Sequence, residues 1–183
     1  GDNVTLEILD MENMSGNITD ILPRKNCLIR PAVANADQAV IIFAASYPKP
    51  DLNLLDRFLL MMGMQGIPVG ICFNKADDVC GEELLQLADK DSGCMVYVTS
   101  TVTGAGIEEL KESLKGRTTV LAGPSGVGKS SVINRLFPEA NMETGDISNK
   151  IKRGKHTTRH SELFSLGDGI YVMDTPGFTS LRL

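Results

Sequence analysis

The sequence of 183 residues lacks the features that mark membrane, secreted and disulfide-rich proteins. No apolar run approaches the ~20 residues that a membrane-spanning helix needs, and no signal-peptide pattern opens the chain. Its four cysteines form no C-x-x-C pair, which favours a reducing, cytoplasmic compartment. The net charge of −5 gives no overall basic footprint for nucleic acid, so any RNA contact needs a local patch or parts outside this sequence.

Size and composition indicate one full globular domain together with part of a second. The 42% of hydrophobic and 22% of charged residues are an ordinary balance for a folded chain. The sequence begins with Gly1 rather than methionine, and its start reads as the middle of a domain. We therefore expect a piece of a longer protein.

The first 31 residues are predicted to form two strands and a linker. Residues 4–9 and 18–22 favour short strands, which are too few to close a core alone. Residues 23–31 lie between prolines and carry the three cations Arg24, Lys25 and Arg30. These cations either contact RNA phosphates or are solvated, and the sequence supports both interpretations equally.

From Asp37 onward, strands alternate with helices, a pattern typical of a parallel α/β sheet. A polar stretch at 142–160 shows no apolar periodicity. The last two strands read as a hairpin around Gly167-Asp168-Gly169. Helices are expected at 52–62 (with Asp51 as N-cap), 82–89, 107–114 and 129–136, and six strands at 40–44, 68–73, 95–99, 119–122, 163–166 and 170–174.

One segment matches the phosphate-loop pattern G-x-x-x-x-G-K-S over its whole length. It lies between a predicted strand and a predicted helix, a context that disfavours a chance glycine-rich turn. Glycines let backbone N–H groups point at phosphate oxygens, and the helix adds its positive end. Lys129 would reach the β- and γ-phosphates, and the Ser130 hydroxyl would bind Mg²⁺. The candidate nucleotide-binding residues here are Gly123, Ser125, Gly126, Val127, Gly128, Lys129, Ser130 and Ser131, with Pro124 between the first two.

Asn74-Lys75-Ala76-Asp77 matches the N-K-x-D element that reads guanine, and it follows a predicted strand. The Asp77 carboxylate can accept hydrogen bonds from N1–H and the 2-amino group of guanine, which adenine lacks. Asn74 would tie this loop to the phosphate loop, and the stem of Lys75 would cover the base. Four letters alone also fit a solvated turn. Beside a phosphate loop, however, they predict a guanine site.

Thr99-Ser100, followed by Thr103-Gly104-Ala105-Gly106, is similar to the S-A-x-x-G-x-G loop that caps guanine O6 through backbone N–H groups. Thr101 stands where alanine is usual. Ser100 is therefore a further candidate for the nucleotide site, although an ordinary glycine-rich turn fits these letters equally well.

Asp174-Thr175-Pro176-Gly177 matches D-x-x-G, in which Asp174 would hold Mg²⁺ and Gly177 would sense the γ-phosphate. The next residue is Phe178, where many GTPases have a glutamine that orients the attacking water. Phenylalanine cannot do this, so water must be positioned by another group.

The segment 154–160 occupies the place of a first switch. His156, Thr157 and Thr158 are the candidate catalytic residues. Thr158 would add its hydroxyl to the Mg²⁺ ligands Ser130 and Asp174, and His156 is the preferred group for placing water. An exposed loop with incidental histidines is the alternative.

The three elements occur in an unusual order. An ordinary small GTPase runs phosphate loop, D-x-x-G, N-K-x-D, whereas this chain runs N-K-x-D, phosphate loop, D-x-x-G. Ligand loops in an open α/β sheet lie at the carboxyl ends of the strands in any chain order. We therefore predict a circularly permuted P-loop GTPase with a six-stranded, mostly parallel sheet and helices on both faces. The old termini would be joined at Lys115-Gly116-Arg117.

Four stretches carry a resemblance to one family, the permuted GTPases of small-ribosomal-subunit assembly called RsgA or YjeQ. They are Pro23-Arg24-Lys25-Asn26 with the text of 30–38 (RPAVANADQ), the text of 122–131 (AGPSGVGKSS), Gly154-Lys155-His156-Thr157-Thr158, and the text of 174–178 (DTPGF). Pro124, where glutamine is common, is a small departure that removes one backbone N–H near the phosphates.

The resemblance implies an RNA-binding OB-fold, a permuted GTPase domain and a zinc-binding domain. Residues 1–30 would be the last OB strands and the linker, and 31–183 the GTPase domain without its switch helix. Zinc is expected only in the C-terminal domain, which this sequence does not include. The family implies Mg²⁺-dependent GTP hydrolysis that is slow alone and stimulated by the small ribosomal subunit and its rRNA. A cytoplasmic monomer without membrane contact is expected.

Three other interpretations remain. The protein could be a GTP-gated RNA-binding assembly factor in which hydrolysis only sets residence time. It could be an ATP-using P-loop enzyme, against which Asp77 argues. It could also be a permuted GTPase of another ribosomal branch, against which the text of 23–38 argues.

Overall fold

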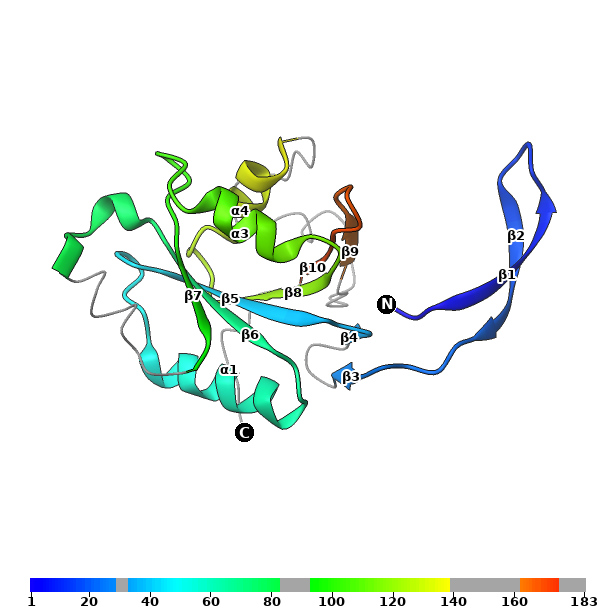
Figure 1. Ribbon diagram of the computed structural model, residues 1–183, viewed down its shortest axis with the longest axis horizontal. Helices are drawn as coiled ribbons and strands as arrows, with labels where there is room; N and C mark the ends of the chain where they lie inside the picture. Colours follow the sequence, from blue (N-terminus) through cyan, green and yellow to red (C-terminus); the bar gives the residue numbers. More distant parts are fainter. Residues whose placement is uncertain (29–32, 83–92, 139–161, 175–183) are drawn as a thin grey trace, which may run out of the picture.

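The computed structural model describes residues 1–28, 33–82, 93–138 and 162–174. Figure 1 shows a helix-covered sheet and, apart from it, a two-stranded hairpin formed by the start of the chain. The side chains of Glu162 and Asp174 and the predicted helix at 82–89, except for its first residue, lie outside the described part.

The sheet has six strands in the order β7-β6-β5-β8-β10-β9. All neighbouring strands are parallel except β9 and β10, which form the expected antiparallel hairpin. This confirms the predicted six-stranded, mostly parallel sheet. The strands are β5 (Gln38–Ala44), β6 (Val69–Asn74), β7 (Met95–Val98), β8 (Thr118–Ala122), β9 (Glu162–Ser165) and β10 (Tyr171–Asp174).

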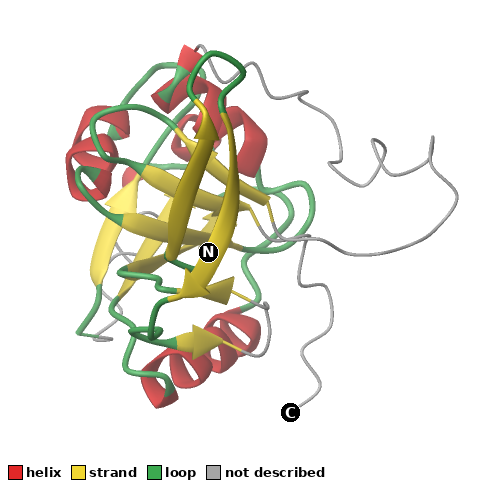
Figure 2. Ribbon diagram, turned by 90° about the vertical axis from the view of Figure 1, so that its right-hand side faces the viewer, coloured by secondary structure: helices red, strands yellow, loops and turns green. Residues whose placement is uncertain are grey.

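Helices cover both faces of the sheet (Figure 2). Strand β5 shows why, because all seven of its residues are buried. Its residues at 41 and 43 pack with α1 (Leu52–Met64), whereas those at 40, 42 and 44 pack with α3 (Ile107–Leu114) and α4 (Lys129–Leu136). The period-two alternation of a strand thus supplies two apolar layers from one apolar run.

The predicted join between the old termini is a tight turn from α3 to β8. Gly116 adopts φ +65°, and the Arg117 N–H donates to the Leu114 carbonyl over 3.2 Å. This turn lies at the edge where β8 begins. The loops that follow β5, β6, β7 and β8 all lie at the opposite edge, because these four strands are parallel.

The hairpin at the start of the chain pairs β1 (Val4–Asp10) with β2 (Ser15–Ile21). Leu6 lies opposite Ile18, and these two residues are 60% and 64% exposed. Two strands without a covering layer cannot bury their apolar residues, as the sequence led us to expect.

The segment predicted as a linker contains a short strand, β3 (Cys27–Leu28), which pairs with β4 (Val33–Ala34). Leu28 is buried in a cluster with Met62 and Met173, so the segment packs on the sheet instead of running free. The Asn26 side chain extends the pairing, donating to the Ala36 carbonyl over 2.7 Å and accepting from the Ala36 N–H over 3.0 Å.

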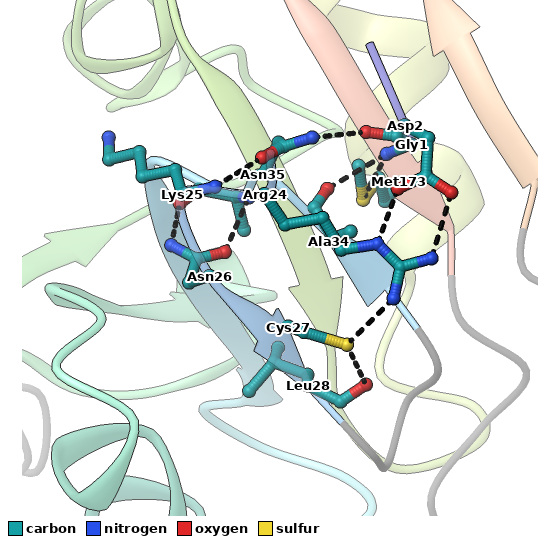
Figure 3. Close-up of polar contacts among 11 residues, drawn as sticks. Gly1, Asp2, Arg24, Lys25, Asn26, Cys27, Leu28, Ala34, Asn35 and Met173 are labelled. Atoms are coloured by element: carbon teal, nitrogen blue, oxygen red, sulfur yellow. Dashed lines mark hydrogen bonds and ion pairs between the residues drawn. The ribbon is translucent and has the colours of Figure 1, made fainter. Parts of the chain in front are cut away.

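Two of the three linker cations lie in ion pairs. Figure 3 shows the Arg24 guanidinium on the Asp2 carboxylate, where Nε and Oδ1 are 2.6 Å apart. The Lys25 ammonium lies 2.7 Å from Asp37. Arg30 lies outside the described residues. These contacts hold the linker against the chain itself, a role that neither sequence interpretation included.

Asp37 connects the linker to the start of β8. Its two oxygens accept from Lys25 and, over 2.8 Å, from the Thr118 N–H. Partial burial alone would raise the pKa of Asp37, but these hydrogen bonds outweigh it and hold the pKa below the ordinary value of 3.8. A carboxylate of lowered pKa stabilises the fold above its unfolded pKa and loses that effect as the pH falls through its folded pKa.

We predict that Asp37→Asn lowers the free energy of unfolding at pH 7 by less than about 1 kcal/mol, since solvent screens the pair. The difference from the parent should shrink as the pH falls through the lowered pKa of Asp37 and vanish once this carboxyl group is protonated. Urea unfolding at pH 7 and at low pH measures both. Lys25→Met should cause a similar loss, and the double variant should lose no more than either single one. A loss that persists unchanged at low pH would contradict this account.

Candidate functional site

The loops that carry the predicted motifs meet at the carboxyl edge of the sheet. The phosphate-loop segment follows β8, the N-K-x-D segment follows β6, and the serine-containing loop follows β7. A fourth loop, residues 45–51, follows β5 at the same edge. No motif drew attention to this loop.

The backbone of the phosphate loop requires glycine. Gly123 has φ +148°, and a Cβ atom there would lie 2.1 Å from the carbonyl oxygen of Ile42. Gly128 has φ +93°, and its Cβ would lie 2.5 Å from the side-chain nitrogen of Asn74. Helix α4 begins at the next residue, so the loop leads directly into a helix amino terminus, as the sequence predicted.

Lys129 lies within this cradle and is only 9% exposed. Its ammonium group donates to the carbonyls of Gly123, over 2.8 Å, and Pro124, over 2.7 Å. The loop thus holds a buried cation at its own backbone carbonyls. Pro124 contributes an acceptor here, although it has no N–H.

Two residues of the N-K-x-D segment contact the phosphate loop. The Asn74 amide donates to the Val127 carbonyl over 3.0 Å, which confirms the predicted tie between the loops. Lys75 adopts φ +64°, and its ammonium donates to the carbonyls of Gly126, over 2.9 Å, and Tyr47, over 2.6 Å.

A buried hydroxyl group holds the side chain of Asn74 by a hydrogen bond. Thr99, which is fully buried directly after β7, donates to the Asn74 side-chain oxygen over 3.4 Å. The Cys72 sulfur lies 3.3 Å from the same hydroxyl, and burial raises the pKa of this thiol to about 12. The chain of contacts orients the amide so that its nitrogen faces Val127. Neither the role of Thr99 nor that of Cys72 was predicted from the sequence.

Ser100 orients the carboxylate of Asp77. Its hydroxyl donates to Asp77 Oδ1 and accepts from the N–H groups of Val102 and Thr103, over 3.2 and 3.1 Å. The Ser100 N–H donates to Ala105. Within the described ranges, the N–H of Thr101, which lies between Ser100 and Val102, donates to no protein acceptor.

Several predicted site residues lie outside the described part of the chain: His156, Thr157, Thr158 and Gly177, together with the side chain of Asp174. The Asp174 backbone ends β10 beside Leu121 of β8, one strand from the phosphate loop. The roles of these residues stay predictions. In the described residues, no three His, Cys, Asp or Glu side chains cluster as metal ligands, and no helix is long and apolar enough to cross a membrane.

A phosphate cradle with a buried lysine, tied by an asparagine to a loop that presents an oriented carboxylate, defines the class. With the N-K-x-D segment preceding the phosphate-loop segment, this is a circularly permuted P-loop GTPase fold. Two solved structures share it. YjeQ from Thermotoga maritima has a TM-score of 0.82 at 35% identity, covering 100% of this chain and 62% of its own. YloQ, described as a circularly permuted GTPase, has a TM-score of 0.72 at 34% identity, covering 100% of this chain and 58% of its own.

Sequence comparison identifies the family. The family model described as RsgA GTPase matches residues 21–183. A small ribosomal subunit biogenesis GTPase RsgA from Agathobacter rectalis is 57% identical over 99% of this chain and 61% of its own length. The RsgA of Alkaliphilus metalliredigens is 49% identical over 100% of this chain and 63% of its own length. The chain belongs to the RsgA GTPase family and spans about three fifths of the length of these relatives.

We predict that Thr99→Val destabilises the fold by about 1–2 kcal/mol, because the Asn74 oxygen loses its buried donor while the side-chain volume is kept. Thr99→Ser retains the hydroxyl and should lose less. Urea unfolding measures both free energies. Equal stability of Thr99→Val and the parent would show that the hydroxyl does not hold Asn74.

Proposed function

We propose that this chain binds guanine nucleotides and hydrolyses GTP as the GTPase domain of an assembly factor for the small ribosomal subunit. One observation carries the proposal. Asn74 and Lys75 attach the loop of Asp77 to the phosphate loop, over 3.0 and 2.9 Å. A single nucleotide would then bridge the two loops, with its base at Asp77 and its phosphates at Lys129.

Asp77 and Ser100 supply the recognition of the base. Guanine donates from N1 and from its 2-amino group, and adenine offers neither donor to a carboxylate. Ser100 already holds one oxygen of Asp77, which fixes the direction of the carboxylate before a ligand arrives. Pre-orientation of this kind lowers the cost of binding.

The other loops would bind the phosphates and Mg²⁺. The cradle formed by residues 123–131 and the Lys129 ammonium would hold the phosphates, and Gly177 would report the γ-phosphate. Ser130, Thr158 and Asp174 would hold Mg²⁺, which neutralises charge on the β- and γ-oxygens when bound.

Hydrolysis by the chain alone should be slow. Phe178 cannot orient water, so the proposal assigns this task to His156, beside Thr157 and Thr158 in the predicted first switch. A partner that arranges this segment would raise the rate. The names of the relatives point to the small ribosomal subunit as that partner.

The remaining proposals follow from the family. Residues 1–30 would be the end of an OB-fold and its linker, which agrees with the exposed apolar residues of the β1–β2 hairpin. Residues 31–183 would be the permuted GTPase domain. Zinc would belong only to a C-terminal domain. The protein would act in the cytoplasm as a monomer and contact rRNA.

The direct test is guanine specificity. The parent chain should bind GTP and GDP, and excess ATP should not displace them; equal binding of ATP and GTP would refute the assignment. We predict that Asp77→Asn weakens GTP binding by about 2–4 kcal/mol, the scale of a lost charged hydrogen-bond partner. The same variant should gain affinity for xanthine nucleotides, because the new amide can donate to the 2-oxo group. Competition against a fluorescent GDP analogue measures the affinity for each of these nucleotides.

A second prediction concerns hydrolysis. His156→Ala in the longer protein should abolish the GTP turnover that small ribosomal subunits stimulate, while GTP affinity stays within about twofold, because the side chain acts on water rather than on the ground-state nucleotide. His160→Ala, in the same segment, is the matched control and should retain stimulation. The 183-residue chain alone should turn over GTP slowly. Stimulated activity in His156→Ala would contradict the role of His156, and fast turnover by this chain alone would contradict the need for a partner.

A further inference from the structure

The loop after β5 contacts both nucleotide loops, although it belongs to no known motif in the sequence. We call residues 45–48 the strap. Its first residue, Ala45, donates its N–H to the Asn74 carbonyl over 2.6 Å, where the guanine-reading loop begins. Its second residue, Ser46, donates its hydroxyl to Oδ2 of Asp78 over 3.2 Å, one position beyond the carboxylate of Asp77.

The second half of the strap faces the phosphate loop. The Tyr47 carbonyl accepts from the Lys75 ammonium, which also donates to the Gly126 carbonyl. Charge-assisted bonds to two carbonyls from two loops make this lysine a bridge between them. Pro48 lies against the phosphate loop, since a Cβ atom on Gly126 would be 3.9 Å from its Cδ.

These contacts fix three loops at one junction. Asn74 and Lys75 reach the phosphate loop, and the strap holds both the start and the end of the segment that carries Asp77. Asp78 closes the short helix η1 (Ala76–Asp78), in which Asp77 is the middle residue. A bond from Ser46 to Asp78 therefore restrains the rotation of the helical turn that aims Asp77.

We propose that the strap sets the spacing between the guanine-reading loop and the phosphate loop, and that Ser46 is a positioning residue for Asp77. The inference rests on the proposed guanine-nucleotide binding and deepens it. A ligand that occupies both loops gains affinity from their preset spacing, as two linked binding events do. A ligand that occupies the phosphate loop alone gains nothing from it.

This difference supplies the test. The parent chain and Ser46→Ala are titrated with GDP, which spans both loops, and with inorganic pyrophosphate, which fills only the phosphate loop. We expect Ser46→Ala to bind GDP three- to tenfold more weakly and pyrophosphate with unchanged affinity. Ser46→Thr keeps a hydroxyl and should bind GDP within twofold of the parent. Ser113→Ala is the matched control, because Ser113 also donates to one oxygen, the Leu110 carbonyl in α3, away from the site.

A double-mutant cycle separates positioning from a general loss of structure. Asp78→Ala should weaken GDP binding as much as Ser46→Ala does, and the double variant should bind no more weakly than either. Thermal unfolding without nucleotide should be the same for all four proteins. Unchanged GDP affinity in Ser46→Ala, additive losses in the double variant, or equal loss of GDP and pyrophosphate would each overturn the role of Ser46. A parent chain that binds pyrophosphate but not GDP would refute the proposed function, and the strap inference with it.

Discussion

The buried hydrogen bond from the Asn74 amide to the Val127 carbonyl is the contact on which the site depends. It joins two loops 53 positions apart in the chain, and Asn74 is only 1% exposed. Water cannot replace a partner lost there, so breaking this bond leaves a buried polar group unpaired. Two other features of the site serve this bond. Gly128 has no side chain where the amide nitrogen passes, and Thr99 holds the amide oxygen.

The sequence predicted the sheet well because its signals are local. The alternation of strands and helices located all six strands, and α3 and α4 have the bounds that the pattern predicted. Asp51 caps α1 by accepting from the N–H groups of Asn53 and Leu54, although that helix continues two residues beyond its predicted end. The strands β3 and β4 were missed, because two residues are too few to show a period.

The candidate site was predictable where a motif names the residue and not elsewhere. The contact of Asn74 with the phosphate loop follows from its motif, whereas the contacts of Thr99 and Ser46 do not. Each of these two hydroxyls finds its partner more than 20 positions away, and neither carries a local pattern. A side-chain hydroxyl acquires its partner only from the packing of the sheet. The position of a loop after a buried parallel strand was the one signal that pointed to residues 45–48.

The tight turn at Gly116 determines how far apart in the sequence the paired strands of the sheet lie. Because the turn sends the chain back into β8, Gln38 of β5 pairs with Thr119 of β8 across 81 positions. The central pair of the sheet therefore closes a long loop, while β5, β6 and β7 pair through shorter ones. Loop-closure entropy grows only logarithmically, by about 0.6 kcal/mol per doubling of length, so the rearranged order costs little stability. The rearranged order instead lowers the folding rate, because distant pairings form slowly. Strands β5, β6 and β7 can pair through nearby contacts, whereas β8 joins them only through its pairing with β5, across 81 positions.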